Sequence, residues 1–149
     1  MDFNLKNNYY AVTGAGNGIG RAVSILLVKN GAKVIGIDKD KNSLFNLKKK
    51  LQKNFIIKNL DCTKSKDIKE ELDDIKKIDG LVNCAGIVPQ GNIMDCSEEE
   101  WAETLNTNLT SIFLITKFFM KKFINQKRGS IVNISSVASS IKGVKRRFA

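Results

Sequence analysis

The residues that could do chemistry begin with a glycine-rich segment, TGAGNGIG, at positions 13–20. A short β-rich run precedes this segment, and a helical pattern follows it. Glycine permits a tight turn and lets a pyrophosphate approach the backbone at the positive end of a helix. The segment is unlike a nucleoside-triphosphate loop, because no Gly-Lys-Ser/Thr follows the glycines. The pattern therefore predicts a dinucleotide-binding turn.

An acidic residue at the end of the next β-rich run adds to this prediction. Asp38 lies 18 residues beyond Gly20, where a carboxylate can hold the ribose hydroxyls of NAD and repel the 2′-phosphate of NADP. The alternative is that Asp38 only ends a strand. Lys39, the next residue, leaves some use of NADP open. We therefore expect NAD as the cofactor, in preference to NADP.

The elements that must position these residues alternate between strands and helices. Strands are expected at 9–13, 33–38, 55–59, 80–83 and 130–135, and helices at 18–29, 43–53 and 67–77. A capping box at Ser97 and Glu100 should open a long helix, which carries Leu105, Leu109, Ile112, Thr116, Phe119 and Phe123 on one stripe. Such alternation implies right-handed crossovers and a parallel sheet covered on both faces. The predicted fold is a doubly wound, Rossmann-type α/β domain with strand order 3-2-1-4-5.

Length, charge and hydrophobicity bound the class of protein. The chain has 149 residues, of which 42% are hydrophobic, and this suits a single domain. Its net charge is +10, and residues 104–149 hold nine basic and no acidic residues. We expect no nucleic-acid binding, because Lys117, Lys121 and Lys122 fall among apolar helix positions; a basic nucleic-acid-binding protein is the alternative class. No membrane span is expected, because Lys117 breaks the longest apolar run.

Cysteine and histidine usage argues against a metal site. The cysteines, Cys62, Cys84 and Cys96, lie far apart without metal-ligand spacing, and the chain has no histidine. We expect three buried thiols in a reducing, cytoplasmic compartment. The N-terminus lacks the basic and apolar regions of a signal peptide.

Five motifs, in order along the chain, resemble those of the short-chain dehydrogenase/reductase family. The family's Thr-Gly-x-x-x-Gly-x-Gly pattern is matched by Thr13, Gly14, Gly18 and Gly20. The other four are Asp61 after the third strand, Asn83-Cys84-Ala85-Gly86 after the fourth, Asn108 in the long helix and Ser135-Ser136 after the fifth. Cys84 stands where the family has a second asparagine. The resemblance implies an oxidoreductase that uses a nicotinamide cofactor.

The resemblance also implies roles for individual residues. With Asp38, the implied cofactor-binding set is Thr13, Gly14, Asn17, Gly18, Ile19, Gly20, Asp61, Cys62, Asn83, Ala85 and Gly86. Asp61 would lie beside the adenine, and the last three would line the nicotinamide side. Asn108 would kink its helix and order a proton-relay water, and Ser136 would hydrogen-bond the substrate oxygen for hydride transfer. The plainer alternatives are an ordinary helix asparagine, a turn serine and a simple β-to-loop turn.

Residues 135–148 narrow the resemblance to one branch, the cytosolic type-2 3-hydroxybutyrate dehydrogenases and the 2-keto-3-deoxy-L-fuconate dehydrogenases. In that branch an arginine binds a substrate carboxylate, and Arg147 falls at its position; a guanidinium suits a carboxylate well. The equal alternative is an exposed basic residue beside Lys145 and Arg146. The resemblance implies a substrate that is the secondary alcohol or ketone of a small hydroxy acid or sugar acid. It also implies a homodimer or homotetramer.

The family's catalytic tyrosine, followed by x-x-x-Lys, has no match in the chain. The only tyrosines are Tyr9 and Tyr10, and neither has a lysine four positions on. Aligned to the branch, the tyrosine would follow Ala149. We therefore expect residues 1–149 to be the N-terminal dinucleotide-binding portion of one short-chain dehydrogenase domain, truncated so that its sheet is incomplete at the C-terminal edge. Without the proton donor we expect little activity, so an inactive NAD-binding fragment or pseudoenzyme is the alternative function.

Overall fold

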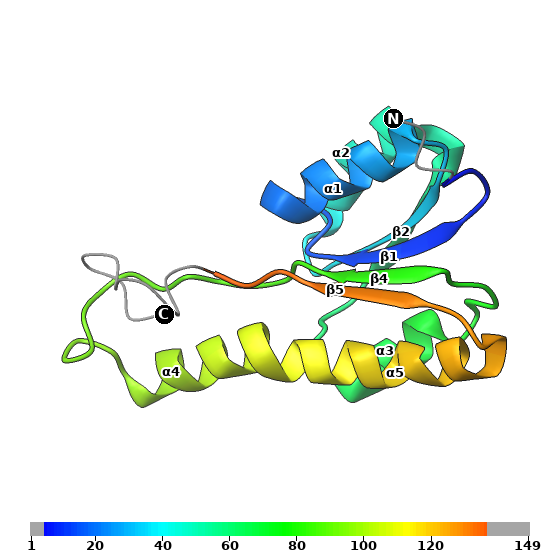
Figure 1. Ribbon diagram of the computed structural model, residues 1–149. Helices are drawn as coiled ribbons and strands as arrows, with labels where there is room; N and C mark the ends of the chain where they lie inside the picture. The colour runs from blue at the N-terminus through cyan, green and yellow to red at the C-terminus, as the bar shows by residue number, and fades with distance from the viewer. Residues whose placement is uncertain (1–4, 137–149) are drawn as a thin grey trace.

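A computed structural model describes residues 5–136 of the chain, and over this range five parallel strands form one sheet (Figure 1). The strands are β1 (Tyr9–Thr13), β2 (Lys33–Asp38), β3 (Phe55–Asn59), β4 (Gly80–Asn83) and β5 (Ser130–Asn133). The helices are α1 (Gly18–Lys29), α2 (Lys41–Leu51), α3 (Ser65–Leu72), α4 (Glu98–Leu105) and α5 (Ser111–Gln126), with a 3-10 turn at Gln52–Asn54 and a π-helical turn at Asn106–Thr110. The sheet order is β3-β2-β1-β4-β5. The predicted doubly wound, Rossmann-type arrangement is confirmed.

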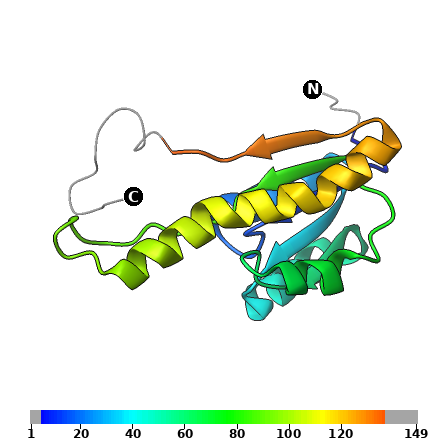
Figure 2. The same ribbon diagram turned by 90° about the horizontal axis from the view of Figure 1, so that it is seen from below.

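Helices cover both faces of this sheet. α1 and α2 lie on one face, and α3 and α5 lie on the other (Figure 1, and Figure 2 from below). Strand side chains alternate between the two layers: Val12 and Val34 pack with the leucines of α2, whereas Ala11 and Ile35 pack with Phe119 of α5. This alternation follows from the pleat of the strands. Both β1 and β2 therefore contribute side chains to the two apolar layers.

The structure agrees with the predicted strands and differs at some helix ends. The first four strands have the predicted bounds, while β5 ends at Asn133. α2 begins at Lys41, because the Asp40 side chain caps it there. α3 ends at Leu72 rather than at 77. Ile78 is nevertheless fully buried without being helical, so apolar spacing alone does not mark the end of this helix.

The long helix is interrupted by the π-helical turn between α4 and α5. Its capping box is confirmed: Glu100 N donates to Ser97 Oγ and Ser97 N donates to Glu100 Oε2, both at 3.1 Å. The predicted stripe is not uniform in burial, since Leu105 and Leu109 are 41% and 64% exposed whereas Phe119 and Phe123 are buried. The buried positions are Thr104, Ser111, Ile115, Phe119 and Phe123. A π-helical turn holds an extra residue, so it changes which residues of the helix face the sheet.

Three general features bear on the kind of site that this fold can carry. Cys62 is buried, whereas Cys84 and Cys96 are half-exposed, so the expectation of buried thiols is correct for Cys62 alone. Across residues 5–136, no three His, Cys, Asp or Glu side chains are grouped to hold a metal ion. In the same range, every helix is too short or too polar to cross a membrane.

Candidate functional site

A groove of about 310 Å³ lies at the carboxyl ends of β1 to β4. The chain leaves β1 toward β2 and β3 on one side and continues to β4 and β5 on the other, so the strand order reverses at this point. Ligands of open α/β sheets bind in the crevice at such a reversal. Its lining comprises Gly14, Asn17, Asp38, Lys39, Asp40, Leu60, Asp61, Cys62, Thr63, Cys84, Ala85, Gly86, Ile87, Thr107 and Ser111.

The glycine loop after β1 is packed tightly against its neighbours. Gly14 has a φ of 63°, and a Cβ on it would lie 3.0 Å from backbone atoms of Cys84 and Ala85. A Cβ on Gly20 would lie 2.3 Å from the carbonyl oxygen of Gly14. Only glycine fits at these two positions. The loop is therefore compact enough to bring the N-terminus of α1 to the groove.

The N-terminus of α1 is open to an acceptor from outside the helix. Its N-cap residue is Asn17, but the Asn17 amide donates instead to Ser43 Oγ, 3.1 Å away in α2. Within the described chain, neither a side-chain cap nor an acidic residue occupies the first turn of α1. Its first N–H groups are thus left for another partner, and the helix dipole favours an anion at that end.

Asp38 presents a carboxylate that the surrounding backbone already orients. Its Oδ2 accepts from the N–H of Gly16 and its Oδ1 from the N–H of Asp40, both at 2.9 Å. A carboxylate has about four lone-pair sites, so each oxygen retains capacity for a further donor. Asp38 thereby joins the glycine loop to the start of α2 and offers acceptors to the groove.

Asp61 and Cys62 form the wall of the groove beyond β3. Asp61 Oδ1 accepts from the N–H and the hydroxyl of Thr63, at 2.9 and 2.8 Å. Burial acts to raise the pKa of Asp61, but these hydrogen bonds and the charges of Lys64 and Lys39 outweigh it and hold the pKa below its ordinary value. Burial raises the pKa of the Cys62 thiol to about 12. Cys62 therefore packs as a neutral side chain at physiological pH.

Thr13, buried at the end of β1, holds the loop that follows β4. Its Oγ1 accepts from the backbone N–H groups of Cys84 and Ala85, both at 3.0 Å. Ala85 and Gly86 consequently line the groove beside the glycine loop. A Cβ on Gly86 would lie 3.1 Å from Asn108 Oδ1, so this loop also passes close to the π-helical turn.

Asn108 lies in the π-helical turn, and its amide pairs with the backbone of Ile87. Asn108 Nδ2 donates to Ile87 O at 2.9 Å, and Ile87 N donates to Asn108 Oδ1 at 2.8 Å. The side chain thus satisfies both backbone groups of Ile87, as a neighbouring strand would. The turn occurs where the family resemblance implies a kink, and π turns recur at functional sites.

Asn83 and Ser136 lie at the carboxyl edge of the sheet but not in the groove lining. Asn83 is buried, and its Nδ2 donates to Thr116 Oγ1 at 3.2 Å and to Asn133 Oδ1 at 2.8 Å. Its side chain therefore ties β4 to β5 and α5, rather than facing the groove as the sequence suggested. Ser136 is exposed and follows the end of β5 by three residues.

The glycine loop, the loop after β4 and the long helix are shared with a known family. The sequence pattern described as short chain dehydrogenase matches residues 8–147. The chain belongs to the short-chain dehydrogenase family. Dehydrogenase/reductase SDR family member 6 of Rattus norvegicus is 41% identical over 143 residues, covering 96% of this chain and 58% of the relative. The 2-keto-3-deoxy-L-fuconate dehydrogenase of Xanthomonas campestris is 38% identical over 144 residues, covering 97% and 48%.

A solved structure of a dehydrogenase has the same fold. The closed form of serine dehydrogenase complexed with NADP+ matches with a TM-score of 0.85 and 30% identity, over 89% of this chain and 56% of that chain. Structural neighbours thus include a nicotinamide-cofactor complex, and sequence relatives include dehydrogenases. The chain spans about half the length of these relatives.

The structure places some residues of the short-chain dehydrogenase motifs in the groove lining and others outside it. The groove lining includes these predicted cofactor residues: Gly14, Asn17, Asp38, Asp61, Cys62, Ala85 and Gly86. Buried Thr13, Gly20 and Asn83 support the groove, Gly18 and Ile19 begin α1, and Arg147 lies outside the described residues. Lining residues that the sequence did not single out include Asp40, Leu60, Thr63, Ile87, Thr107 and Ser111. Of these residues, only Asp40 could have been found from the local sequence, because it is an acidic residue just before a helical pattern.

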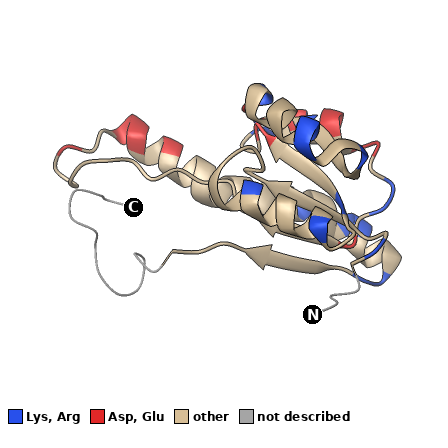
Figure 3. Cartoon of the chain, turned by 90° about the horizontal axis from the view of Figure 1, so that it is seen from above, with Lys and Arg blue, Asp and Glu red and all other residues tan. Residues whose placement is uncertain are grey.

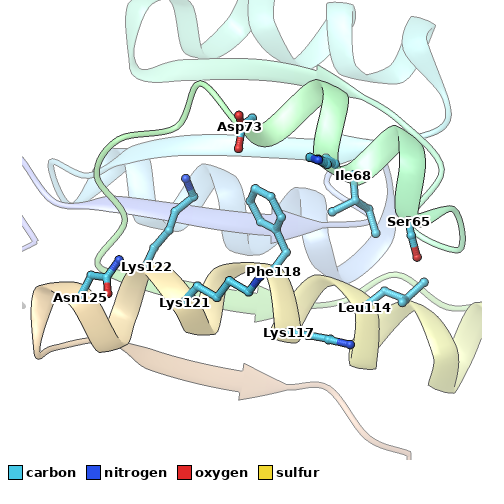
Figure 4. Close-up of a pocket in the computed structure, with 10 residues that line it drawn as sticks. Ser65, Ile68, Asp73, Leu114, Lys117, Phe118, Lys121, Lys122 and Asn125 are labelled. Atoms are coloured by element: carbon cyan, nitrogen blue, oxygen red, sulfur yellow. The ribbon is translucent and has the colours of Figure 1, made fainter.

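A second groove, of about 450 Å³, lies between α3 and α5 (Figure 4). Apolar side chains of Ile68, Leu114 and Phe118 line it, together with the lysines Lys69, Lys117, Lys121 and Lys122. Figure 3 shows that the acidic residues of α4 and the lysines of α5 lie at different ends of the long helix. None of the predicted cofactor residues within the described range lines this groove. It is therefore separate from the candidate dinucleotide site.

Asn108→Ala is expected to lower the free energy of unfolding of this short-chain dehydrogenase chain by about 2 kcal/mol, because both backbone groups of Ile87 lose their partners. The amide of Ile87 should exchange faster with solvent. Urea unfolding and hydrogen exchange measure the two effects. Asn106→Ala, in the same turn but with an exposed side chain, is the control. Unchanged exchange at Ile87 would contradict the assigned role.

Proposed function

We propose that residues 1–149 form the N-terminal, dinucleotide-binding portion of an NAD-dependent short-chain dehydrogenase. The reaction would transfer a hydride between NAD and the secondary alcohol or ketone of a small hydroxy acid or sugar acid. One observation carries the cofactor assignment: the Asp38 carboxylate, held by the amides of Gly16 and Asp40, lies beside the uncapped N-terminus of α1. Family membership and dehydrogenase relatives support the oxidoreductase part.

The residues of the groove fit the parts of a dinucleotide. The open N–H groups of α1 and the glycine loop suit a pyrophosphate, and the acceptors of Asp38 suit the adenosine ribose. Asp61 and Cys62 would flank the adenine, while Ala85 and Gly86 would line the nicotinamide side. When bound, the cofactor supplies the hydride acceptor or donor. The contribution of this chain is to bind and orient it.

NAD is proposed in preference to NADP. The Asp38 carboxylate would repel a 2′-phosphate while accepting hydrogen bonds from ribose hydroxyls. Lys39 also lines the groove and offers a compensating positive charge. Because a structural neighbour is complexed with NADP+, the preference rests on Asp38 and not on the fold.

Ser136 and Asn108 are the proposed catalytic residues of this portion. The Ser136 hydroxyl would donate to the substrate oxygen and orient it for hydride transfer. The Asn108 side chain is already hydrogen-bonded to the backbone of Ile87. A proton-relay water would therefore bind to the backbone of the π-helical turn. Arg147 would bind a substrate carboxylate through its guanidinium. The sugar-acid substrate named for the Xanthomonas campestris relative supports this substrate class.

NAD binding without turnover is the second candidate function. It is favoured because the chain spans 58% of the Rattus norvegicus relative and its sequence contains no Tyr-x-x-x-Lys. Turnover by the 149-residue chain would reject this candidate. NAD binding without turnover would support it.

We further propose a cytoplasmic homodimer or homotetramer that acts on small molecules. Several large apolar side chains of the long helix are exposed, namely Leu105, Leu109, Phe113 and Ile124, which supports their burial in an assembly. The three cysteines are free, which supports a reducing compartment.

Calorimetric titration with NAD and NADP tests the cofactor assignment. We expect NAD to bind more tightly than NADP, and Asp38→Ala to weaken NAD binding about 10–100-fold through the loss of charge-assisted hydrogen bonds. Asp73→Asn, which removes a carboxylate from the second groove, is the control and should leave NAD binding unchanged. Absence of NAD binding by the unaltered chain would reject the proposal.

A further inference from the structure

The groove between α3 and α5 has apolar side chains along its length. Ile68 of α3 is buried, and Leu114 and Phe118 of α5 are half-buried. Figure 4 shows Ile68 and Phe118 pointing into the space between the two helices. Leu114 and Asn125 lie 11 positions apart on α5, which is about 16 Å at the helical rise. The groove, of about 450 Å³, therefore has room for an extended apolar chain.

The charged side chains of this groove are mostly basic. They are Lys69, Lys117, Lys121 and Lys122, with Asp73 as the carboxylate. Within residues 5–136, none of these four lysines forms an ion pair with a carboxylate, and α5 itself contains no acidic residue. Lys122 Nζ instead lies 5.2 Å from the centre of the Phe118 ring, a contact that leaves its charge in place. The lysines therefore repel one another, and an anion in the groove would relieve that repulsion.

The surplus of charge favours a phosphate over a carboxylate as the head group of such an anion. The lining carries three more positive than negative charges. A phosphate monoester carries about −1.5 to −2 charge at pH 7, whereas a carboxylate carries one negative charge. Lysine binds phosphate as a point charge, and Ser65 and Asn125 add hydrogen-bond donors to the same lining.

We propose that this groove is a second ligand site, which binds a single-chain phosphate monoester. The apolar chain would lie against Ile68, Leu114 and Phe118, and the phosphate would lie among the lysine ammonium groups. Lysine stems pack along apolar surface while their charged ends stay in water, so the lysines also extend the apolar walls. The site is independent of the proposed NAD binding, because its lining shares no residue with that of the first groove.

Dodecyl phosphate, kept below the concentration at which it forms micelles, is the probe for this site. Its binding to the 149-residue chain is measured by calorimetry, at about 50 and 500 mM salt and with or without saturating NAD. Dodecanoate and dodecyltrimethylammonium keep the chain and change the charge of the head group, whereas inorganic phosphate lacks the chain.

Two double variants locate the site. Lys69→Gln with Lys121→Gln removes two exposed charges from the groove and keeps residues of similar helix propensity. Lys49→Gln with Lys50→Gln removes two exposed charges from α2, which covers the other face of the sheet (Figure 1). The two variants have the same net charge, and circular dichroism checks that both are folded.

We expect dodecyl phosphate to bind at least about threefold more tightly than dodecanoate, and at least about 30-fold more tightly than dodecyltrimethylammonium or inorganic phosphate. The variant in the groove should weaken dodecyl phosphate binding by about 5–10-fold at low salt and by less at high salt, where charge is screened. The α2 variant and saturating NAD should each leave the affinity within about twofold of the parent.

Equal binding of dodecyltrimethylammonium, or an equal loss in the α2 variant, overturns the inference, because the charge of this groove would then not hold the ligand. Equal binding of dodecanoate overturns the choice of phosphate, and equal binding of inorganic phosphate overturns the role of the apolar chain. Competition by NAD would place the ligand in the first groove and also overturns the inference.

Sedimentation measures the one other occupant that this surface could take, a second copy of the chain. A groove variant that changes the association state but not the affinity for dodecyl phosphate would assign the groove to that copy and overturn the inference. A chain that binds NAD but not dodecyl phosphate refutes this inference alone. A chain that binds dodecyl phosphate but not NAD refutes the proposed function alone.

Discussion

Replacing Gly20 by alanine is expected to lower the free energy of unfolding by about 3 kcal/mol and to abolish the proposed NAD binding. The added Cβ would lie 2.3 Å from the carbonyl oxygen and 2.7 Å from the carbonyl carbon of Gly14, and 2.9 Å from the carbonyl oxygen of Thr13. These are backbone atoms, so no side-chain rotation relieves the overlap. The start of α1 must move away from β1, and the groove loses its shape. Urea unfolding measures the first effect, and calorimetry measures the second.

Gly18→Ala is the matched control for this prediction. Gly18 has a φ of 51°, but a Cβ on it would meet no atom within 4 Å. The substitution adds only the strain of the left-handed region, about 1 kcal/mol. Equal losses of stability in the two variants would refute the packing argument, as would normal NAD binding by Gly20→Ala.

Asp79→Ala is expected to cost about 2–3 kcal/mol of stability, because a single buried carboxylate joins neighbouring strands at the amino edge of the sheet. Asp79 Oδ2 accepts from the Tyr9 N–H at 2.9 Å, and Oδ1 lies 2.7 Å from Arg128 Nη2. The Asp79 backbone also donates to Tyr9 O at 2.7 Å and accepts from Ser130 N at 3.3 Å. Because the side chain is only 9% exposed, its loss leaves the Tyr9 N–H without an acceptor. Thermal and urea unfolding measure the change.

Asp74→Ala provides a comparison in which the ion-pair distance is the same. The Lys58–Asp74 pair also has a separation of 2.7 Å, but the Asp74 side chain is 71% exposed. Solvent screens such a pair, so the expected loss is below about 1 kcal/mol. A loss as large as that of Asp79→Ala would show that burial does not decide the strength of these contacts.

The strands of this fold are predictable from sequence, whereas the course of the long helix is not. The first four strands are short apolar runs near turn-forming residues, and those residues indicate where each strand begins or ends. Residues 106–110 have no local pattern that separates a π turn from an α-helix. The turn coincides with the pairing of Asn108 and Ile87, which are 21 residues apart. Helical periodicity therefore groups exposed Leu105 and Leu109 with buried Phe119 and Phe123 on a single stripe.

Some features of the candidate site can likewise be predicted from the local sequence, whereas others depend on tertiary packing. The glycine loop and Asp38 follow from short spacings, because a tight turn and a strand end are local features. The contact between Asn17 and Ser43 spans 26 residues and depends on how α2 packs on the loop. Likewise, the buried amide of Asn83 faces Thr116 and Asn133. The sequence places Asn83 at the edge of the sheet without revealing which way its side chain points.

The π-helical turn also governs how changes in chain length can be accommodated. Deleting one residue from 106–110 would allow an uninterrupted α-helix with complete local hydrogen bonding. Because the π turn already holds one extra residue, removing it would leave α4 and α5 in nearly their present relative orientation, with Thr104 still in the core. Adding or removing a residue within α4 itself would instead rotate the residues before it by about 100° relative to α5. Helix geometry therefore accommodates a single-residue deletion within these five residues, except at Asn108, whose pairing with Ile87 would be lost.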